Sequence, residues 1–432
     1  MLNKIRNNIF LKSTLVLLFG GVLGKLIGFI LRIIVTRKLG AEGMGLYSLL
    51  APTSSLLSVI ATLSYPTALS KIISEKSSRT KTLFASIIPL SLIINVFIIG
   101  VTIILAPHLS TLLKNESLYY PIICLSLVTP FISISSIIKG YFWGKQNMFP
   151  YMLSNFIEQL TRITIITLFI NHFLSISLIH TISFIILVNA IGEIISQLVM
   201  IYFFPKNIKP NITDINKNDI KKVMSISIPS TSSKIIGSIS YFLEPIVLTN
   251  TLIYVGYSKD FIIYEYGVIN AYAMSLLLMP QFFTQNMATS LVPELSKYYS
   301  ERNIEMCKKR IKQIILISSS IGALSTLIIT LFPSFFLNIL YHTKEGIDYI
   351  KLLSPFTILF YIEYPLINAL QALGKSKSAM KCTIISSCVR LISIFTLSLL
   401  KIGMYSLILS IIINLILSTF LYTREIKKIL TN

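Results

Sequence analysis

Long apolar stretches are the feature that most restricts the fold of this 432-residue chain. Cutting the sequence where charges, Gly and Pro cluster leaves about twelve segments, each near or above the roughly 20 residues that a helix needs to cross a bilayer. Only 13% of the residues are charged, against roughly a quarter in soluble proteins. We therefore predict an all-α polytopic membrane protein. The expected spans are 13–35, 45–70, 83–106, 119–140, 149–171, 177–204, 223–252, 266–293, 313–340, 349–373, 382–400 and 403–423.

Positive charge is distributed unevenly between the two ends of these spans. A net charge of +21 would suggest a nucleic-acid partner in a soluble protein. If the N-terminus is inside, however, 26 Lys and Arg residues fall on the cytoplasmic side and six on the outer side. This bias predicts that both termini are cytoplasmic and that the surroundings are membrane lipids, without nucleic acid. The six outer cations are Arg37, Lys38, Lys114, Lys259, Lys344 and Lys401.

The residue types that carry most enzymatic and metal chemistry show no suitable arrangement. No Ser-His-Asp order and no Gly-rich phosphate loop is present, and the expected outer loops are short. We expect no metal and no other cofactor, while a coupling ion or the membrane potential stays possible, and we expect a transporter rather than a membrane enzyme. The four cysteines, which lack paired metal-binding spacing and lie outside the expected outer loops, are Cys124, Cys307, Cys382 and Cys388.

An internal repeat with a period near 226 residues organises the chain. The segment 69–76 resembles 295–302, and Pro52 has a counterpart in Pro280. Six spans separate the copies, so both halves enter the membrane in the same direction. This predicts two parallel six-helix lobes related by a pseudo-two-fold axis along the membrane normal, with the substrate path between them. The lobes are expected at 1–204 and 223–432, joined by a basic cytoplasmic linker at 205–222.

Nine charged residues fall inside the expected spans. Each costs roughly 2.5–3.5 kcal/mol at the centre of a lipid-facing helix, so they must face one another or water. A polar interior is therefore expected, in which the acids serve as coupling or counter-charge groups. The cations are Lys25, Arg32, Arg162, Lys234 and Arg390, and the acids are Glu158, Glu193, Glu244 and Glu363.

The cations of the first span are the strongest candidates for a binding site. Lys25 and Arg32 are two turns apart on one face, and their span contains no acid. Lys234 occupies the matching place in the second half, so the three predict a site for an anion. Arg162 and Arg390 are expected as secondary contacts. For Arg162 an alternative is structural, because Glu158 precedes it by four residues and can pair with it on the same helix.

Two prolines inside apolar spans are candidate hinges. Pro52 and Pro280 occupy matching positions in the second span of each half. Each lacks a backbone N–H and removes one hydrogen bond from its helix, which favours a kink. A kink of this kind serves either as a hinge or as a packing device, and the proline pattern supports both.

Several short motifs in the first eighty residues resemble one known family. They are Gly28-Phe29 with Arg32, the segment 39–47, Ala51-Pro52-Thr53 and the segment 66–71. The pattern is similar to the stage V sporulation protein B family, in the polysaccharide transporter branch of the multidrug/oligosaccharidyl-lipid/polysaccharide flippase superfamily. The basic pattern from Lys25 to Arg32 also resembles that of lipid II flippases, with the second cation one residue later. Members of the sporulation family usually carry two further C-terminal helices beyond spans like these.

The resemblance implies a fold like that of multidrug extrusion transporters and an alternating-access flippase in a bacterial cytoplasmic membrane. The implied cargo is an undecaprenyl-pyrophosphate-linked sugar, a precursor of peptidoglycan or another polysaccharide. Spore cortex or cell-wall synthesis, with proteins of that pathway as partners, follows from the family alone. Two alternatives remain: a multidrug/cation antiporter, which the two cations and missing acid of the first span disfavour, and a non-transporting scaffold for cell-wall assembly.

Overall fold

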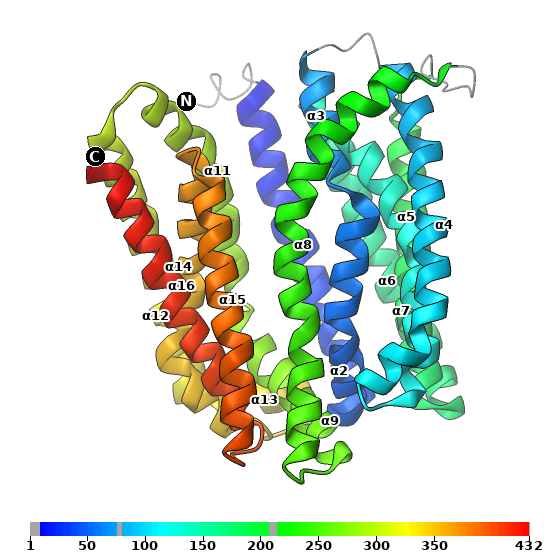
Figure 1. The fold of residues 1–432 in the computed structure, drawn as a ribbon, viewed down its shortest axis with the longest axis vertical. Helices are drawn as coiled ribbons and strands as arrows, with labels where there is room; N and C mark the ends of the chain where they lie inside the picture. The colour runs from blue at the N-terminus through cyan, green and yellow to red at the C-terminus, as the bar shows by residue number, and fades with distance from the viewer. Residues whose placement is uncertain (1–8, 76–79, 207–213, 432) are drawn as a thin grey trace. The chain divides into compact units, whose positions relative to one another are not determined.

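The computed structural model describes residues 9–75, 80–206 and 214–431, and every element in these ranges is a helix (Figure 1). Eleven helical stretches of the described chain are long and apolar enough to cross a membrane. The first, Leu23–Glu75, has 53 residues, enough for two crossings of roughly 20 residues each. The expected all-α fold of about twelve spans is confirmed.

The helices follow the apolar segments of the sequence in order. In the first half they are α2 (Ile9–Thr62), α3 (Tyr65–Glu75), α4 (Thr80–Leu112), η2 (Glu116–Leu118), α5 (Tyr119–Gly144), α6 (Phe149–Ile176) and α7 (Leu178–Tyr202). In the second half they are α8 (Lys217–Tyr254), α9 (Lys259–Gly267), η4 (Val268–Met274), α10 (Ser275–Leu278), α11 (Gln281–Ser300), α12 (Ile304–Leu331), α13 (Pro333–Tyr341), α14 (Ile347–Ala372), α15 (Ser376–Leu399) and α16 (Tyr405–Thr431).

The expected loop between the first two spans is replaced by a sharp break at one residue. The label α2 covers two helices that meet at Gly40, whose φ of 65° and ψ of −170° lie outside the helical region. Glycine reaches such a conformation without strain because it lacks Cβ. The second span then ends at a bend formed by Leu63 and Ser64, both with positive φ, before α3 begins. Arg37 and Lys38 interrupt the apolar pattern, but the helix continues past them and ends at Gly40.

The expected eighth span, 266–293, is interrupted rather than continuous. Residues Val268–Met274 form a π-helix, the short helix α10 follows, and Pro280 separates it from α11. Pro280 cannot donate a backbone hydrogen bond. The next residue, Gln281, donates a side-chain hydrogen bond from Nε2 to the carbonyl oxygen of Phe360 on α14, at 2.8 Å.

The described chain forms two compact units. The first contains residues up to Val35 together with Leu50–Phe242, and the second contains Thr36–Leu49 and the chain from Leu243 onward. Compared with the expected lobes, the start of the second span lies in the second unit and most of α8 lies in the first. Helix α8 is attached there by Lys222, 3.6 Å from Glu75, and by Thr231, whose hydroxyl donates to Ser64 Oγ. The expected linker at 205–222 is only partly within the described residues.

Each unit has an apolar core built from corresponding parts of the repeat. In the first unit, Leu69 on α3 packs with residues at the start of α4 and the end of α5. In the second, Leu295 on α11 packs with the start of α12 and the end of α14. Leu69 and Leu295 are matching positions of the sequence repeat, and both are completely buried. The repeat is therefore visible in how each unit builds its core.

Two glycines allow an unusually close helix crossing inside the second unit. A Cβ on Gly45 of α2 would lie 1.9 Å from the carbonyl oxygen of Ile263 on α9. A Cβ on Gly267 would lie 1.8 Å from the carbonyl oxygen of Ala41 on α2. The two backbones are thus in direct contact, and any side chain at either glycine would push them apart.

Candidate functional site

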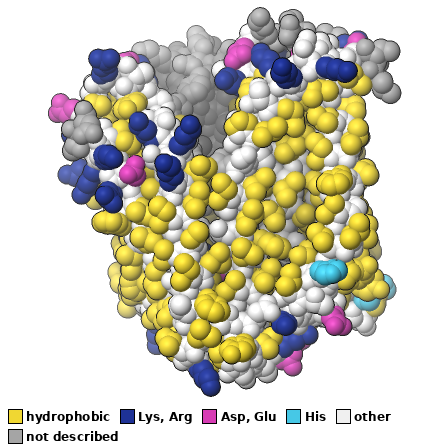
Figure 2. Space-filling view, in the orientation of Figure 1, with side chains coloured by type: hydrophobic (Ala, Val, Ile, Leu, Met, Phe, Trp, Pro, Cys, Tyr) yellow, Lys and Arg dark blue, Asp and Glu magenta, His cyan; other side chains and the backbone are white. Residues whose placement is uncertain are grey.

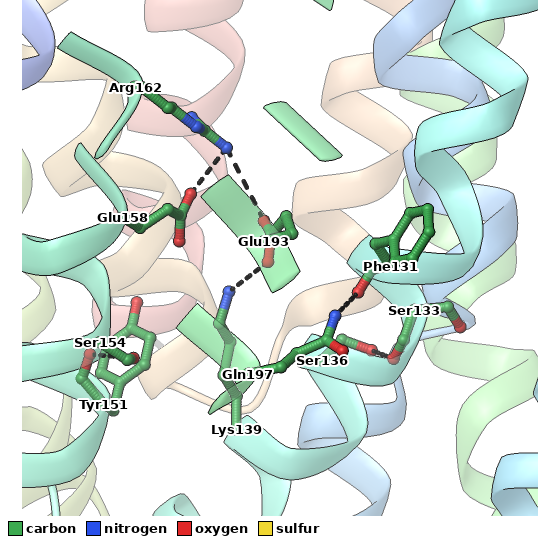
Figure 3. A network of polar contacts seen from close by, with 10 residues as sticks. All are labelled: Phe131, Ser133, Ser136, Lys139, Tyr151, Ser154, Glu158, Arg162, Glu193 and Gln197. Atoms are coloured by element: carbon green, nitrogen blue, oxygen red, sulfur yellow. Dashed lines mark hydrogen bonds and ion pairs between the residues drawn. The ribbon is translucent and has the colours of Figure 1, made fainter. Parts of the chain in front are cut away.

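Four charged side chains form a buried network inside the first unit (Figure 3). Arg162 on α6 pairs with Glu158 one turn earlier, at 2.7 Å between Nη2 and Oε1. The same nitrogen lies 4.0 Å from Oε1 of Glu193 on α7. Lys139 on α5 lies 3.6 Å from Oε2 of Glu193. The network joins three helices and balances two positive with two negative charges, as buried ion pairs require.

The absence of a side chain at Gly192 leaves space for Arg162, the largest side chain of this network. A Cβ at Gly192 on α7 would lie 2.8 Å from Nε of Arg162, so the guanidinium group lies against the α7 backbone. Further along α7, Gln197 donates from Nε2 to the carbonyl oxygen of Phe131 at 2.6 Å (Figure 3). Helices α5, α6 and α7 are therefore held together by polar contacts in the middle of an apolar unit.

The second unit has its own membrane-embedded ion pair, with a different charge balance. Arg390 on α15 lies 2.8 Å from Glu244 on α8, between Nη2 and Oε2. Glu363 on α14 interacts with the Ser418 hydroxyl and with the charge of Arg390. Two acids thus share one arginine here. All four predicted acids are within interaction range of an arginine, although their predicted coupling role is not tested by these contacts.

The three primary cations of the predicted anion site are more exposed than the two predicted secondary contacts. Lys25 and Arg32 on α2 and Lys234 on α8 have exposed side chains, whereas Arg162 and Arg390 are mostly buried in ion pairs. The sequence placed Lys234 in the second half, but the structure places all three cations in the first unit. The reason is that α8 is one continuous helix whose first part packs on the first unit.

Glycines shape the helix that carries Lys25 and Arg32. A Cβ at Gly24 would lie 2.9 Å from Nδ2 of Asn155 on α6, and one at Gly28 would lie 3.6 Å from Oε1 of Gln159. The glycine face of α2 therefore packs on polar side chains of α6, as expected for small residues at helix contacts.

The two predicted hinge prolines occupy different local structures. Pro52 lies within α2, three residues after Leu49, where the chain passes from the second unit to the first. Pro280 separates two helices of the second unit. Pro245, which we did not predict, follows the passage from Phe242 to Leu243 in α8. A proline inside the expected span 223–252 was the signal that could have found it.

Lys139 is the other residue that sequence reasoning missed. We counted it among the cytoplasmic cations, although it lies within the expected span 119–140, and the structure places it in the buried network. Its position before the end of the span was the available signal. Within the described residues, no group of three or more His, Cys, Asp or Glu side chains could hold a metal ion.

Comparison with known proteins agrees with this architecture. A family model described as "Polysaccharide biosynthesis protein" matches residues 10–299, and the MatE model matches residues 269–396. Stage V sporulation protein B of Bacillus subtilis (strain 168) is 30% identical over 98% of this chain and 84% of its own length. Lipid II flippase MurJ of the same organism is 21% identical over 88% of this chain and 76% of its own length.

Among solved structures, an inward-facing multidrug resistance MATE family transporter of the MOP superfamily has a similar fold. The TM-score is 0.77 at 17% sequence identity, over 94% of this chain and 95% of that one. This similarity shows the transporter fold, and the sequence matches show the family. The chain belongs to the polysaccharide biosynthesis protein family of membrane transporters.

Proposed function

We propose that this protein is an alternating-access flippase that exports an undecaprenyl-pyrophosphate-linked sugar across a bacterial cytoplasmic membrane. Family membership and the similarity to a protein named as a lipid II flippase support a lipid-linked cargo. The transporter fold supports movement of that cargo rather than chemistry on it.

The exposure of the membrane cations is the observation that carries the proposal. Arg162 and Arg390 are engaged by acids within interior ion pairs, whereas Lys25, Arg32 and Lys234 present exposed side chains. An exposed charge at membrane depth is costly against lipid and is stable only beside water or an anion. We assign these three side chains to an aqueous path in which they contact the pyrophosphate of the cargo.

The proposed site replaces the hydration of the cargo. A diphosphate is strongly hydrated, and its transfer into hydrocarbon without compensation is prohibitive. Lysine and arginine donate charge-assisted hydrogen bonds to phosphate oxygens, while the polyprenyl chain stays in lipid. An inside-negative potential favours export, because each negative charge moved outward gains roughly 2.3 kcal/mol per 100 mV.

The arginines and acids receive supporting roles in this proposal. Arg162 and Arg390 remain predicted secondary contacts, and their ion pairs support the alternative that they mainly hold helices together. In the second unit, Glu244 and Glu363 share one arginine, so among the described residues there are two acids for one cation here. We propose that a proton or another monovalent cation binds there and couples to transport. Pro52 and Pro280 remain the proposed hinges.

A cation antiporter is the second candidate, favoured by this excess acid in the second unit and by the MatE match over residues 269–396. Such a transporter would bind a cationic drug. The exposed cations Lys25 and Arg32 would repel it, as like charges in a medium of low dielectric constant do. Transport of an organic cation by reconstituted protein would favour this candidate over the flippase.

The deciding experiment is reconstitution in liposomes with several undecaprenyl-pyrophosphate sugars and measurement of translocation. We expect transport by the wild type and its loss in the Lys25→Ala/Arg32→Ala variant, with insertion and folding unchanged. Lys25→Arg should retain partial transport, because charge is kept while donor geometry changes. Lys38→Ala, which removes an exposed cation from the same helix, is the matched control. Normal transport by the double variant would contradict the proposed site.

The biological setting is proposed from the relatives alone. A relative covering nearly the whole chain is named Stage V sporulation protein B, so we propose a role in spore cortex or cell-wall synthesis, with wall-synthesis proteins as partners. Deletion of the gene in a spore-forming host should reduce heat-resistant spores. Normal spore yield after deletion would contradict the sporulation role without affecting the flippase proposal.

A further inference from the structure

One end of the second unit gathers the ends of several helices around a single apolar core. Cys307 and Ile311 at the start of α12 pack with Cys382 near the start of α15 and with Tyr422 and Ile426 near the end of α16. The core also includes the end of α14. Helices α12, α15 and α16 thus surround one core at the end that we expect to be cytoplasmic.

The exposed sides of these helix ends are strongly basic. Eight exposed cations lie in the first or last turns of the three helices, whereas only Glu305 and Glu425 are acidic there. Figure 2 shows Lys and Arg side chains gathered over this end of α15 and α16. We name this surface the basic patch, and its members are Lys308, Lys309, Lys312, Lys377, Lys381, Arg424, Lys427 and Lys428.

The corresponding end of the first unit is organised differently. There Lys81 lies 2.9 Å from Asp214 and Lys222 lies 3.6 Å from Glu75, so local acids compensate these two cations. Within the described chain, no salt bridge of this kind is formed by the patch members of α12 and α15. Beside the patch, Arg310 pairs with Glu294 at 2.9 Å, while the patch cations of α12 and α15 stay outside the described salt bridges.

We propose that the basic patch is a binding surface for the headgroups of anionic phospholipids. The cations lie in the end turns of helices that are long and apolar enough to cross a membrane, where we expect the headgroup layer. Clusters of four to eight Lys and Arg residues at such positions attract anionic lipids. The apolar sides of the same helix turns are buried in the protein core, so the charged sides remain available to the membrane surface. This inference does not depend on the identity of the transported cargo.

The test measures lipid binding to the purified full-length protein. Phosphatidylglycerol is titrated into protein in neutral detergent, and native mass spectrometry counts the bound lipids, with phosphatidylcholine as the neutral comparison. Each lysine near an anionic surface contributes roughly fivefold in affinity. The variant Lys308→Gln/Lys309→Gln/Lys312→Gln should therefore bind phosphatidylglycerol at least about tenfold more weakly. High salt should weaken the wild type similarly, because screening reduces attraction between exposed charges.

The matched control removes three exposed cations from the same end of the first unit: Lys71→Gln/Lys145→Gln/Lys217→Gln. It should bind phosphatidylglycerol within about twofold of the wild type. An equal loss in both triple variants would show general charge attraction and overturn the proposal. Unchanged binding in the patch variant would also overturn it and leave an acidic protein as the partner to test. Because translocation is not measured, failure here is distinguishable from failure of the flippase proposal.

Discussion

Gly45 and Gly267 allow a close helix contact in the second unit, and substitution of either glycine should destabilise the protein. Gly45→Ala and Gly267→Ala each place a methyl group within 2 Å of a carbonyl oxygen on the facing helix, so the helices must separate. We expect destabilisation of about 3 kcal/mol or more, at the upper end of overpacking effects. Thermal unfolding in detergent measures this change.

Gly100 provides a control, because it lies within α4 and a Cβ there meets nothing within 4 Å. Gly100→Ala should leave stability unchanged or raise it slightly, since alanine loses less backbone entropy than glycine. Equal unfolding temperatures for the Gly45→Ala and Gly100→Ala variants would contradict the close crossing of α2 and α9.

The buried network of the first unit makes a second prediction at the residue scale. Among the described residues, Arg162→Met leaves Glu158 and Glu193 with Lys139 as their one cationic partner, which should cost about 3–5 kcal/mol. Glu158→Gln/Arg162→Met restores charge balance and should recover most of this loss.

Transport by the double variant then distinguishes the two readings of Arg162. If Arg162 only holds helices together, the stable double variant should translocate cargo normally. If Arg162 also contacts the cargo, stability should recover while translocation stays low. A double variant as unstable as Arg162→Met would contradict the charge-balance argument itself, and unfolding curves of the three proteins decide this.

At the scale of helices, the sequence predicted the number and order of spans because long apolar segments have few structural alternatives in a membrane. It did not predict that α2 continues through Arg37 and Lys38, because helix termini were placed where charges cluster. It also missed the π-helix at Val268–Met274, which has no clear sequence signal. Glu158 and Arg162 were identified as a possible pair from their spacing on one helix, whereas their contact partners on α5 and α7 depend on tertiary packing.

The contact between α2 and α9 gives a prediction about conformational change. If access alternates between the two sides of the membrane and this contact opens in one of the two states, the expected outer ends of these helices separate during transport. Cysteines introduced as Met44→Cys and Tyr266→Cys, in a background where Cys124, Cys307, Cys382 and Cys388 are replaced by Ser, should form a disulfide that stops translocation. Reduction should restore it, and each single-cysteine variant is the control. Full activity of the oxidised double variant would contradict alternating access through this contact.

For the whole molecule, the two units show why one sequence repeat can give two different charge environments. Leu69 and Leu295 occupy matching core positions, so the apolar repeat preserves packing. The charged positions diverge: the first unit has a balanced network of four side chains, while the second has two acids for one arginine. Packing constrains apolar positions by shape, whereas membrane charges are retained only where a partner or a function compensates them.

Topology is the prediction that tests the parallel repeat as a whole. Helix α8 has 38 residues and a length of about 57 Å, so one helix is long enough to place its ends on opposite sides of a bilayer. In the cysteine-free background, Lys217→Cys at its start should react only with reagents that reach the cytoplasm, and Ser258→Cys beyond its end only from outside. Ser376→Cys, at the start of α15, should behave like Lys217→Cys, because the positive-inside bias places both segments in the cytoplasm. All three positions are exposed, so a difference in labelling reports sidedness rather than burial. Labelling of Lys217→Cys and Ser258→Cys from the same side would require α8 to lie outside the membrane, and the two halves could then no longer enter it in the same direction.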